Sequence, residues 1–253
     1  MRNKFLMFMV AVAVLTGTGC ATTTSAYNPF KVDQEKFFST IETIALAPAS
    51  VPVELAASEQ RISQFESLVE NKLREIGFTV VRSHEYRDIW KRENQLIGGC
   101  FDSATGRMDE TKFRTVQERT CQELKKQFNV DAILLIDILV VKANFRQFEA
   151  EWDGAEESFD VRHGVLKFLD TSTTKGTVGA LSMRATINDM DGIALYVNQG
   201  GIQVLSKYGS GGFTPVPVNA LLTSEERNVG AVNIALGPLV RNPSVEGSQK
   251  GEE

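Results

Sequence analysis

Hydrophobic positions in the first half of the chain follow strand-like and helix-like spacings in turn. The run Ile41–Ala47 alternates and stops at Pro48, which predicts a first strand. A helix capped by Ser58 and stopped by Gly77 is predicted next. Its apolar face consists of Ile62, Phe65, Val69, Leu73 and Ile76. Residues 78–81 then predict a second strand.

The same alternation of elements continues to the middle of the chain. A short helix is predicted around Tyr86–Trp90, and residues 98–108 are predicted to form a loop. A longer helix follows, with Phe113, Val116, Leu124 and Phe128 on one face. The continuous apolar run Val130–Asp137 predicts a central strand covered on both faces. The order strand, helix, strand, helix, strand is typical of an α/β layer.

Antiparallel strands are predicted in the second half. Residues 165–169 and 179–188 have strand character, and Asp191-Gly192 predicts a hairpin turn into 193–197. A last helix is predicted to begin near Thr223, with Glu226 as its capping-box partner. Its expected buried face consists of Val229, Val232, Leu236 and Leu239. The fold class is therefore α/β, with a mixed sheet that is parallel at first, added antiparallel strands, and helices packed on the sheet.

Composition adds limits to this picture. The 253 residues carry a net charge of -5, and Lys and Arg are scattered, which argues against nucleic-acid binding. Neither an internal repeat nor a linker interrupts residues 36–240, so we expect a single domain there. The polar tail, residues 241–253, is expected to be disordered.

The N-terminus has the organisation of a bacterial secretion signal. Positive residues precede the uncharged run Phe5–Leu15, which is too short to span a bilayer permanently. Small residues then lead to Cys20, and this stretch resembles the lipobox, in which the Cys is acylated and becomes the first mature residue. Gly19 fits that pattern, whereas Gly17 stands where the pattern prefers Leu. The alternative is an ordinary secretory signal that is cleaved near Gly19 or Ala26.

The lipobox resemblance carries several expectations. Residues 1–19 are the signal peptide, Cys20 carries acyl chains such as palmitate, and residues 20–35 form a lipidated tether. Two or more acyl chains give a stable membrane anchor. Ala21 follows the Cys where a retention signal for the inner membrane would place Asp. We therefore expect the periplasmic face of the outer membrane.

Three cysteines are present, and lipidation of Cys20 leaves Cys100 and Cys121 as a pair in an oxidising compartment. We predict a disulfide between them, which would close a loop of about 20 residues. The alternative is two free thiols. A zinc site is not expected, because neither a CxxC motif nor a nearby His accompanies these cysteines.

The mature chain also resembles an α/β module of envelope proteins. The resemblance rests on a strand that ends at Pro48, the pattern Leu-x-x-x-Gly-Phe at Leu73–Phe78, and Val-Asp-Ala at Val130–Ala132 before an apolar strand. This module occurs in the curli-secretion lipoprotein and in the N-terminal domain of TolB. The turn at 170–176 departs from the short Thr-Gly turn of that module. The resemblance implies an assembly or scaffold role and no catalysis.

Residues for catalysis or cofactor binding are few. A Ser/His/Asp hydrolase would need His84 or His163 as its base, and the sequence has no Gly-x-Ser-x-Gly elbow. Asp189–Gly192 resembles the start of a calcium loop but lacks the closing Glu. Asp131 and Asp137 are about 20 Å apart along a strand, too far for paired acid/base work. We expect no enzyme activity, no cofactor and no metal.

A partner-binding loop is the remaining candidate site. It comprises Gly209, Gly211, Gly212 and Phe213, just before two prolines, and Gly200-Gly201 is also expected in a flexible loop. Trp152, in an acidic stretch, is a recognition candidate if exposed and a packed turn residue if not. These features favour a structural or assembly lipoprotein that binds another envelope protein. The alternatives are a ligand-binding or regulatory lipoprotein and an unrecognised hydrolase.

Overall fold

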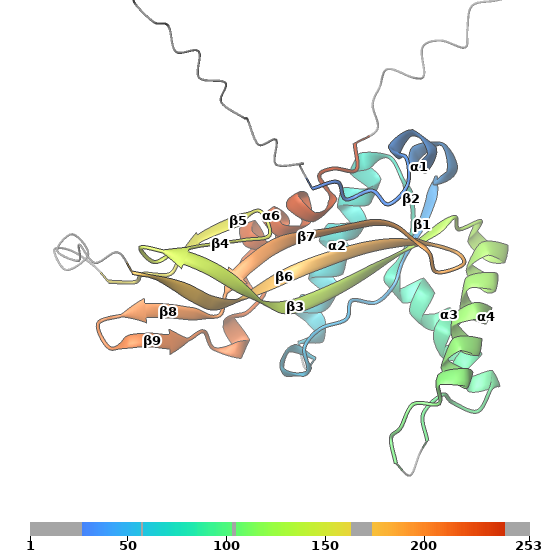
Figure 1. The fold of residues 1–253 in the computed structure, drawn as a ribbon. Helices are drawn as coiled ribbons and strands as arrows, with labels where there is room; N and C mark the ends of the chain where they lie inside the picture. Colours follow the sequence, from blue (N-terminus) through green and yellow to red (C-terminus); the bar gives the residue numbers. More distant parts are fainter. Residues whose placement is uncertain (1–26, 57, 103–104, 163–173, 241–253) are drawn as a thin grey trace, which may run out of the picture.

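The structure is a computed structural model that describes residues 27–56, 58–102, 105–162 and 174–240. The helices and strands follow one another as in Figure 1. The helical elements are α1 (Gln34–Thr40), η1 (Val53–Leu55), α2 (Glu59–Ile76), α3 (Ser83–Leu96), α4 (Glu110–Phe128), η2 (Val218–Ala220) and α6 (Glu225–Leu236). The strands are β1 (Thr43–Leu46), β2 (Thr79–Val81), β3 (Ala132–Arg146), β4 (Glu149–Trp152), β5 (Ala155–Ser158), β6 (Lys175–Asp189), β7 (Ala194–Val204), β8 (Ser206–Gly209) and β9 (Gly212–Pro215).

The described strands form a mixed sheet, which confirms the predicted α/β class. β1 lies between β2 and β3 and is parallel to both. β3 then pairs antiparallel with β6 along its whole length and with β4 at its far end. β7 pairs with β6, and β5 pairs with β4. The parallel half and the added antiparallel strands are therefore both present, and β8 and β9 form a separate hairpin.

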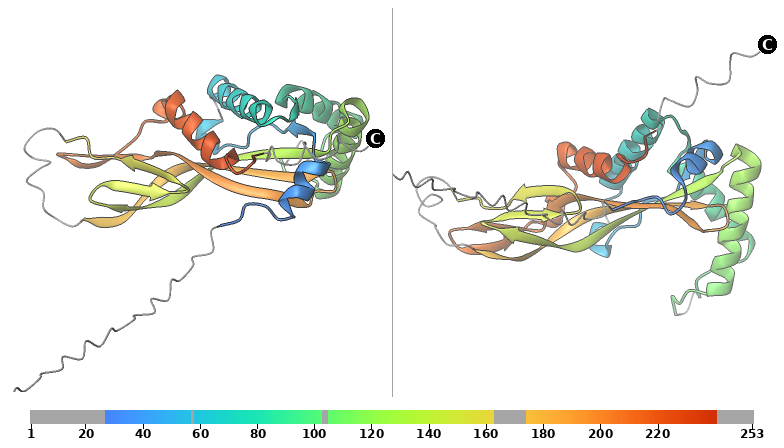
Figure 2. Two further views of the ribbon diagram at one scale, coloured as in Figure 1. Left: turned by 90° about the horizontal axis from the view of Figure 1, so that it is seen from above. Right: turned by 45° about the horizontal axis from the view of Figure 1, so that its top comes forward.

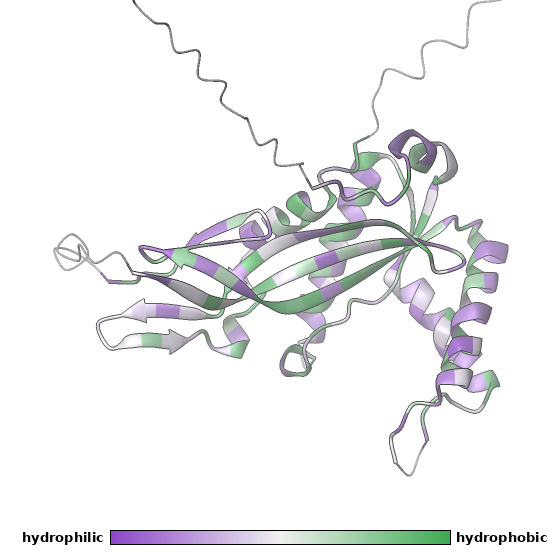
Figure 3. Ribbon diagram, viewed as in Figure 1, coloured by the Kyte–Doolittle hydropathy of each residue, from purple (hydrophilic) through white to green (hydrophobic). Residues whose placement is uncertain are grey.

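Helices cover both faces of the parallel half. Side chains alternate along β1, so that Ile44 and Leu46 enter one hydrophobic cluster while Ala45 and Ala47 enter another. The first cluster includes residues of α1, α2 and α6, and the second includes residues of α3 and α4. Figure 3 shows mostly hydrophilic residues along α4 and hydrophobic stretches along β3. This part of the molecule has three layers, as the apolar run in β3 indicated.

Local signals set the helix ends. α2 ends at Gly77, whose φ of 103° permits the N–H of Phe78 to donate to the carbonyl of Leu73 (3.0 Å). Ser58 stands at the N-cap as predicted, but its hydroxyl makes no capping hydrogen bond to the helix. α4 begins at Asp109, whose carboxylate accepts from two backbone N–H groups, and ends at Asn129 with φ 53°. α3 is longer than the predicted short helix, since its 14 residues pack against α4.

The sheet extends beyond the helices and rolls up there. β3 and β6 each have 15 residues, more than the predicted strands at 130–137 and 179–188. Figure 2 shows the helices gathered over one end of the sheet and the other end projecting past them. At this projecting end the β4–β5 turn reaches back to β7, where the N–H of Gly201 donates to the carbonyl of Asp153 (3.1 Å). The rolled strands enclose a second hydrophobic core.

The domain begins before residue 36. The Tyr27 hydroxyl donates to the carbonyl of Val197 (2.7 Å), and the N–H of Lys31 donates to the carbonyl of Leu195 (2.8 Å). Phe30 is buried against Tyr196, with ring centroids 5.2 Å apart. The chain from residue 27 thus runs beside β7, joined to it by an isolated bridge between Phe30 and Tyr196, so the predicted tether (20–35) contacts the folded domain from residue 27 on.

Several expectations concern residues outside those described. They are the signal peptide, the acylated Cys20, the strand at 165–169, His163 and the tail at 241–253.

α6 lies directly on β7, and this contact corrects two predictions. The helix is capped by Ser224 rather than Thr223, with the Ser224 hydroxyl accepting from the N–H of Arg227 (3.4 Å). Val232, Leu236 and Leu239 are buried as predicted, but Val229 is exposed. Gly200 lies in β7 and not in the predicted loop. A β-carbon at this position would overlap the carbonyl oxygen of Ala231, so the close approach of α6 to β7 requires a glycine here.

Two glycine-to-alanine substitutions test this close approach. Gly200→Ala should lower the free energy of unfolding by about 2 kcal/mol, because the new methyl must push α6 off the sheet. Gly230→Ala, on α6 with open space around it, should raise it by roughly 0.5–1 kcal/mol through helix propensity. Urea denaturation of both variants measures the difference. Equal effects would contradict the packing described.

Candidate functional site

The predicted partner-binding residues form a β-hairpin at the projecting end of the sheet. Gly209 and Gly212 are paired across the β8–β9 turn, and Gly212 has a φ of 94°, which favours glycine. Phe213 follows on β9 opposite Tyr208 and is 52% exposed. Gly211 has open space around it. The expected flexible loop is therefore an ordered hairpin with a glycine-rich tip.

An aromatic cluster supports Phe213. Its ring is stacked on that of Phe159 (5.9 Å between centroids) and lies edge-on to Tyr208 (5.1 Å). Phe148 stacks on Tyr208 at 4.4 Å, and Phe145 meets Phe159 edge-on at 5.1 Å. We call these five residues the aromatic end. Because four of the rings are buried or half-buried, the exposed face of Phe213 is held in one position by rigid neighbours.

A cation lies over this cluster. The guanidinium of Arg162 is 4.8 Å from the ring centroids of both Phe148 and Tyr208. It also forms an ion pair with the carboxylate of Asp160 (2.9 Å), and both side chains are largely buried. The planar guanidinium can stack and pair at once, which a lysine could not do. This arrangement fixes the segment before residue 163 against β8, where the N–H of Val161 donates to the carbonyl of Tyr208 (2.9 Å).

Trp152 is not an exposed recognition residue. Its side chain is 7% exposed, and its indole N–H donates to the carbonyl of Leu181 (3.1 Å). It belongs to the core of the rolled sheet, so the packed alternative holds. The turn that follows it is a tight one, since Asp153 and Gly154 have φ values of 43° and 76°.

Most of the aromatic end is absent from the sequence-based prediction. Phe148, Ala150 and Trp152 are buried at every second position, which is the spacing of a strand with one buried face. That alternation, followed by the dipeptide Asp153-Gly154, is the signal that predicts the β4–β5 hairpin. The approach of Phe159 to β9 depends on long-range pairing, for which the sequence contains no local signal.

The predicted Cys100–Cys121 disulfide is wrong for this structure, in which both residues are free thiols. The carbonyl of Cys100 accepts from the N–H of Asp109 (2.8 Å), so Cys100 lies at the start of α4. Cys121 is twelve residues further along, or about 18 Å at the helical rise of 1.5 Å per residue. Bridged cysteines need α-carbons within about 7 Å.

Alkylation tests this correction. Denatured but unreduced Cys20→Ser protein should take up two alkyl groups, and uptake of none would contradict the structure.

In the folded protein, burial raises the pKa of the Cys121 thiol, and Asp191 and Glu118 raise it further. Its thiolate is therefore scarcer than in the unfolded chain, so native Cys121 should react more slowly near pH 8 than the unfolded thiol does. That rate should still climb at a pH where the denatured rate has levelled off, as mass spectrometry of quenched samples would show.

Groups suited to catalysis do not converge in the described part of the chain. His84 is exposed on α3, and no three His, Cys, Asp or Glu side chains lie close enough to hold a metal ion there. Asp131 accepts from the N–H of Thr43 (2.9 Å), and Asp137 forms an ion pair with Arg184 (2.8 Å). The two carboxylates thus have separate structural partners. No helix among residues 27–56, 58–102, 105–162 and 174–240 has the length and apolarity to cross a bilayer.

Comparison with known proteins identifies no family. No protein-family model matches the chain, and no curated protein matches it. The crystal structure of lipoprotein GNA1162 from Neisseria meningitidis is 15% identical, covers 64% of this chain and 81% of its own, and has a TM-score of 0.32. Two crystal forms of the PelC dodecamer from Paraburkholderia phytofirmans are 11% and 10% identical and cover 80% of this chain and 91% of their own, with TM-scores of 0.34. Similarity at this level carries no argument about the protein.

Proposed function

We propose that this protein is a non-enzymatic, lipid-anchored protein of the bacterial envelope that binds another envelope protein through its aromatic end. The observation that carries the proposal is the exposed ring of Phe213 on a rigid aromatic base. Aromatic residues and arginine are enriched at the centres of protein interfaces. A preordered ring loses little side-chain entropy when a partner covers it.

The position of the aromatic end also supports this role. It lies at the projecting end of the sheet, away from the helices (Figure 2). Val161, 47% exposed, adds a second apolar side chain beside the β8–β9 hairpin, where it lies near Gly209. Exposed apolar groups that gather at one end of a domain are typical of an interaction site.

The anchor rests on the N-terminal sequence. A signal-like apolar run and Cys20 precede the described domain, and Ala21 favours the outer membrane. Tyr27 is already fixed to β7, so six residues separate Cys20 from the folded domain. We infer that the domain sits close to the periplasmic face of the outer membrane.

Radiolabelled palmitate tests the anchor. Cells that express the full chain should yield a labelled band, and the Cys20→Ser variant should yield none, because acylation needs the thiol. Fractionation of the envelope on a density gradient then distinguishes outer from inner membrane. An unlabelled wild-type band would reduce the claim to secretion alone.

A photo-crosslinking amino acid tests the partner surface. Placed at position 213, it should join the protein to one specific envelope protein in living cells. Position 101 is the matched control, because Phe101 is also a phenylalanine, is 54% exposed, and lies in the α3–α4 loop at the other end of the molecule (Figure 1). Equal crosslinking from both positions would contradict a specific surface.

The captured protein then permits a quantitative check. Phe213→Ser should weaken its binding about 30-fold, which corresponds to about 2 kcal/mol for an interface aromatic residue. Phe101→Ser should change binding less than twofold. Thermal unfolding of both variants controls for stability. No loss with Phe213→Ser in a folded protein would remove the aromatic end as the binding site.

A further inference from the structure

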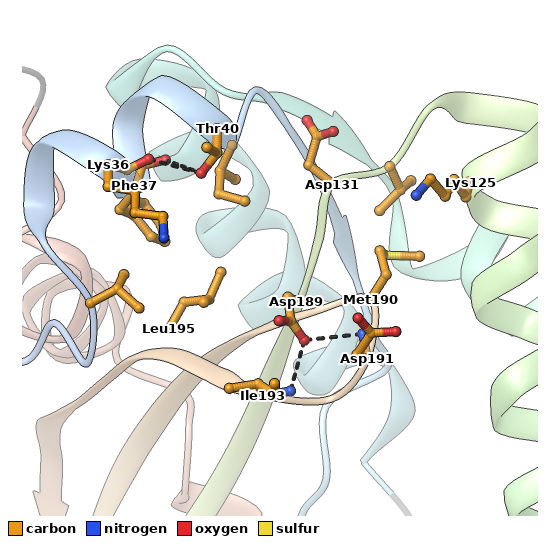
Figure 4. Close-up of a pocket in the computed structure, with 13 residues that line it drawn as sticks. Lys36, Phe37, Thr40, Lys125, Asp131, Asp189, Met190, Asp191, Ile193 and Leu195 are labelled. Atoms are coloured by element: carbon orange, nitrogen blue, oxygen red, sulfur yellow. Dashed lines mark hydrogen bonds between the residues drawn. The ribbon is translucent and has the colours of Figure 1, made fainter.

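A pocket of about 460 Å³ lies at the opposite end of the β3–β6 pair from the aromatic end. Figure 4 shows it between α1, the last turn of α4, the start of β3 and the turn from β6 to β7. Pockets of about 300–1,000 Å³ are the size range of small-molecule sites. The aromatic end and the sequence motifs do not account for it.

The floor of this pocket is apolar. Phe37, Ile41 and Val130 line it and are each at most 4% exposed. Leu195 continues the floor, and Ile193 stands at the edge with 62% of its surface exposed. A ligand that enters can therefore place a polar group at the rim and apolar groups against Ile193.

Charges of both signs surround the opening. In Figure 4 Lys36 and Lys125 come from opposite sides, while Asp131 and the pair Asp189 and Asp191 lie above and below them. Such an alternation fits a ligand that is itself a zwitterion. A simple anion or a simple cation would meet repulsion from half of the rim.

The carboxylates are held in place but retain acceptor capacity. One oxygen of Asp131 accepts from the N–H groups of Glu42 (3.0 Å) and Thr43 (2.9 Å). One oxygen of Asp189 accepts from the N–H groups of Asp191 (3.0 Å) and Ile193 (2.8 Å). In each case the second oxygen has no partner among the described residues.

The two lysines supply the opposite charge. Within the described residues neither Lys36 nor Lys125 forms an ion pair, whereas the neighbouring Lys126 pairs with Glu123 (3.5 Å). An ammonium group without an ion pair can donate charge-assisted hydrogen bonds to a phosphate oxygen.

We propose that this pocket binds the headgroup of a zwitterionic phospholipid, with its ammonium at Asp189 and its phosphate at Lys125. The membrane is the favoured source because the N-terminal segment that leads to Cys20 forms one wall through Val32. This part rests on the lipid anchor of the proposed function. The exposed Ile193 would then face the acyl region of the lipid.

A soluble probe tests the site without lipidation. The full Cys20→Ser chain is titrated with glycerophosphoethanolamine while the backbone amide signals of Asp191 and Ile193 are followed by NMR. It should bind at least tenfold more tightly than glycerol phosphate or ethanolamine, each of which lacks one charge. The expected loss is that of a charge-assisted hydrogen bond. Equal binding of all three probes, or none, would overturn the proposal, and so would tighter binding of a free amino acid.

The neighbouring lysines on α4 supply matched variants. Lys125→Gln should weaken glycerophosphoethanolamine about tenfold, while Lys126→Gln should leave its affinity unchanged. Equal losses in the two would overturn the site. Because both residues are exposed, neither variant threatens the fold.

Vesicles identify the source of the headgroup. The same Cys20→Ser chain should sediment with phosphatidylethanolamine vesicles more than with phosphatidylglycerol vesicles, and Lys125→Gln should reduce this. Binding of the soluble probe without vesicle binding would overturn the membrane assignment. Absence of palmitate labelling would refute the proposed lipid anchor but would not affect the result with the soluble probe. Failure of the anchor and failure of the pocket proposal can therefore be told apart.

Discussion

The antiparallel ladder between β3 and β6 is the interaction on which the rest of the structure depends. It runs without interruption from the pair Ala132–Asp189 to the pair Arg146–Lys175. One end is covered by helices on both faces, and the other end carries the rolled sheet and its aromatic core. Fifteen residues of strand span about 50 Å, so one rigid element joins the pocket at Asp189 to the rings near Phe145. A membrane bound at the pocket and a partner bound at the aromatic end would therefore lie at opposite ends of the β3–β6 ladder.

The sequence predicted the helix-covered end far better than the projecting end. Apolar spacing in α2 and the stop at Gly77 are local properties, and both are correct. β3 was predicted to end at Asp137. The apolar run continues through Val141, and polar and apolar residues then alternate to Arg146, so the longer strand has a local signal beyond the predicted end. Its antiparallel pairing with β6 along the whole length has no such local signal. Val229 was misassigned for a related reason: the side of α6 that is buried depends on where β7 lies.

The candidate site was found only in part. Phe213 and its glycines were predicted to form a flexible partner-binding loop, whereas they form a hairpin in which Phe213 is exposed. Trp152 was a candidate because it is aromatic in an acidic stretch, but its side chain lies in the core of the rolled sheet, and Glu157 of the same stretch pairs with Lys207 and Arg227. The disulfide was inferred from the number of cysteines and the expected oxidising compartment, and the helix α4 keeps the two thiols apart. The pocket gave no signal, because its walls come from three separate segments of the sequence.

Adjacent glycines in β7 explain how the two halves of the molecule share one sheet. Neighbouring residues of a strand face opposite sides. A β-carbon at Gly200 would overlap α6, and one at Gly201 would overlap Trp152. The sheet is therefore approached closely from both sides at a single point, by the helical layer on one face and by the β4–β5 hairpin on the other. Any larger pair of residues would separate one of the two layers, so the rolled end and the helix-covered end are coupled through these two positions.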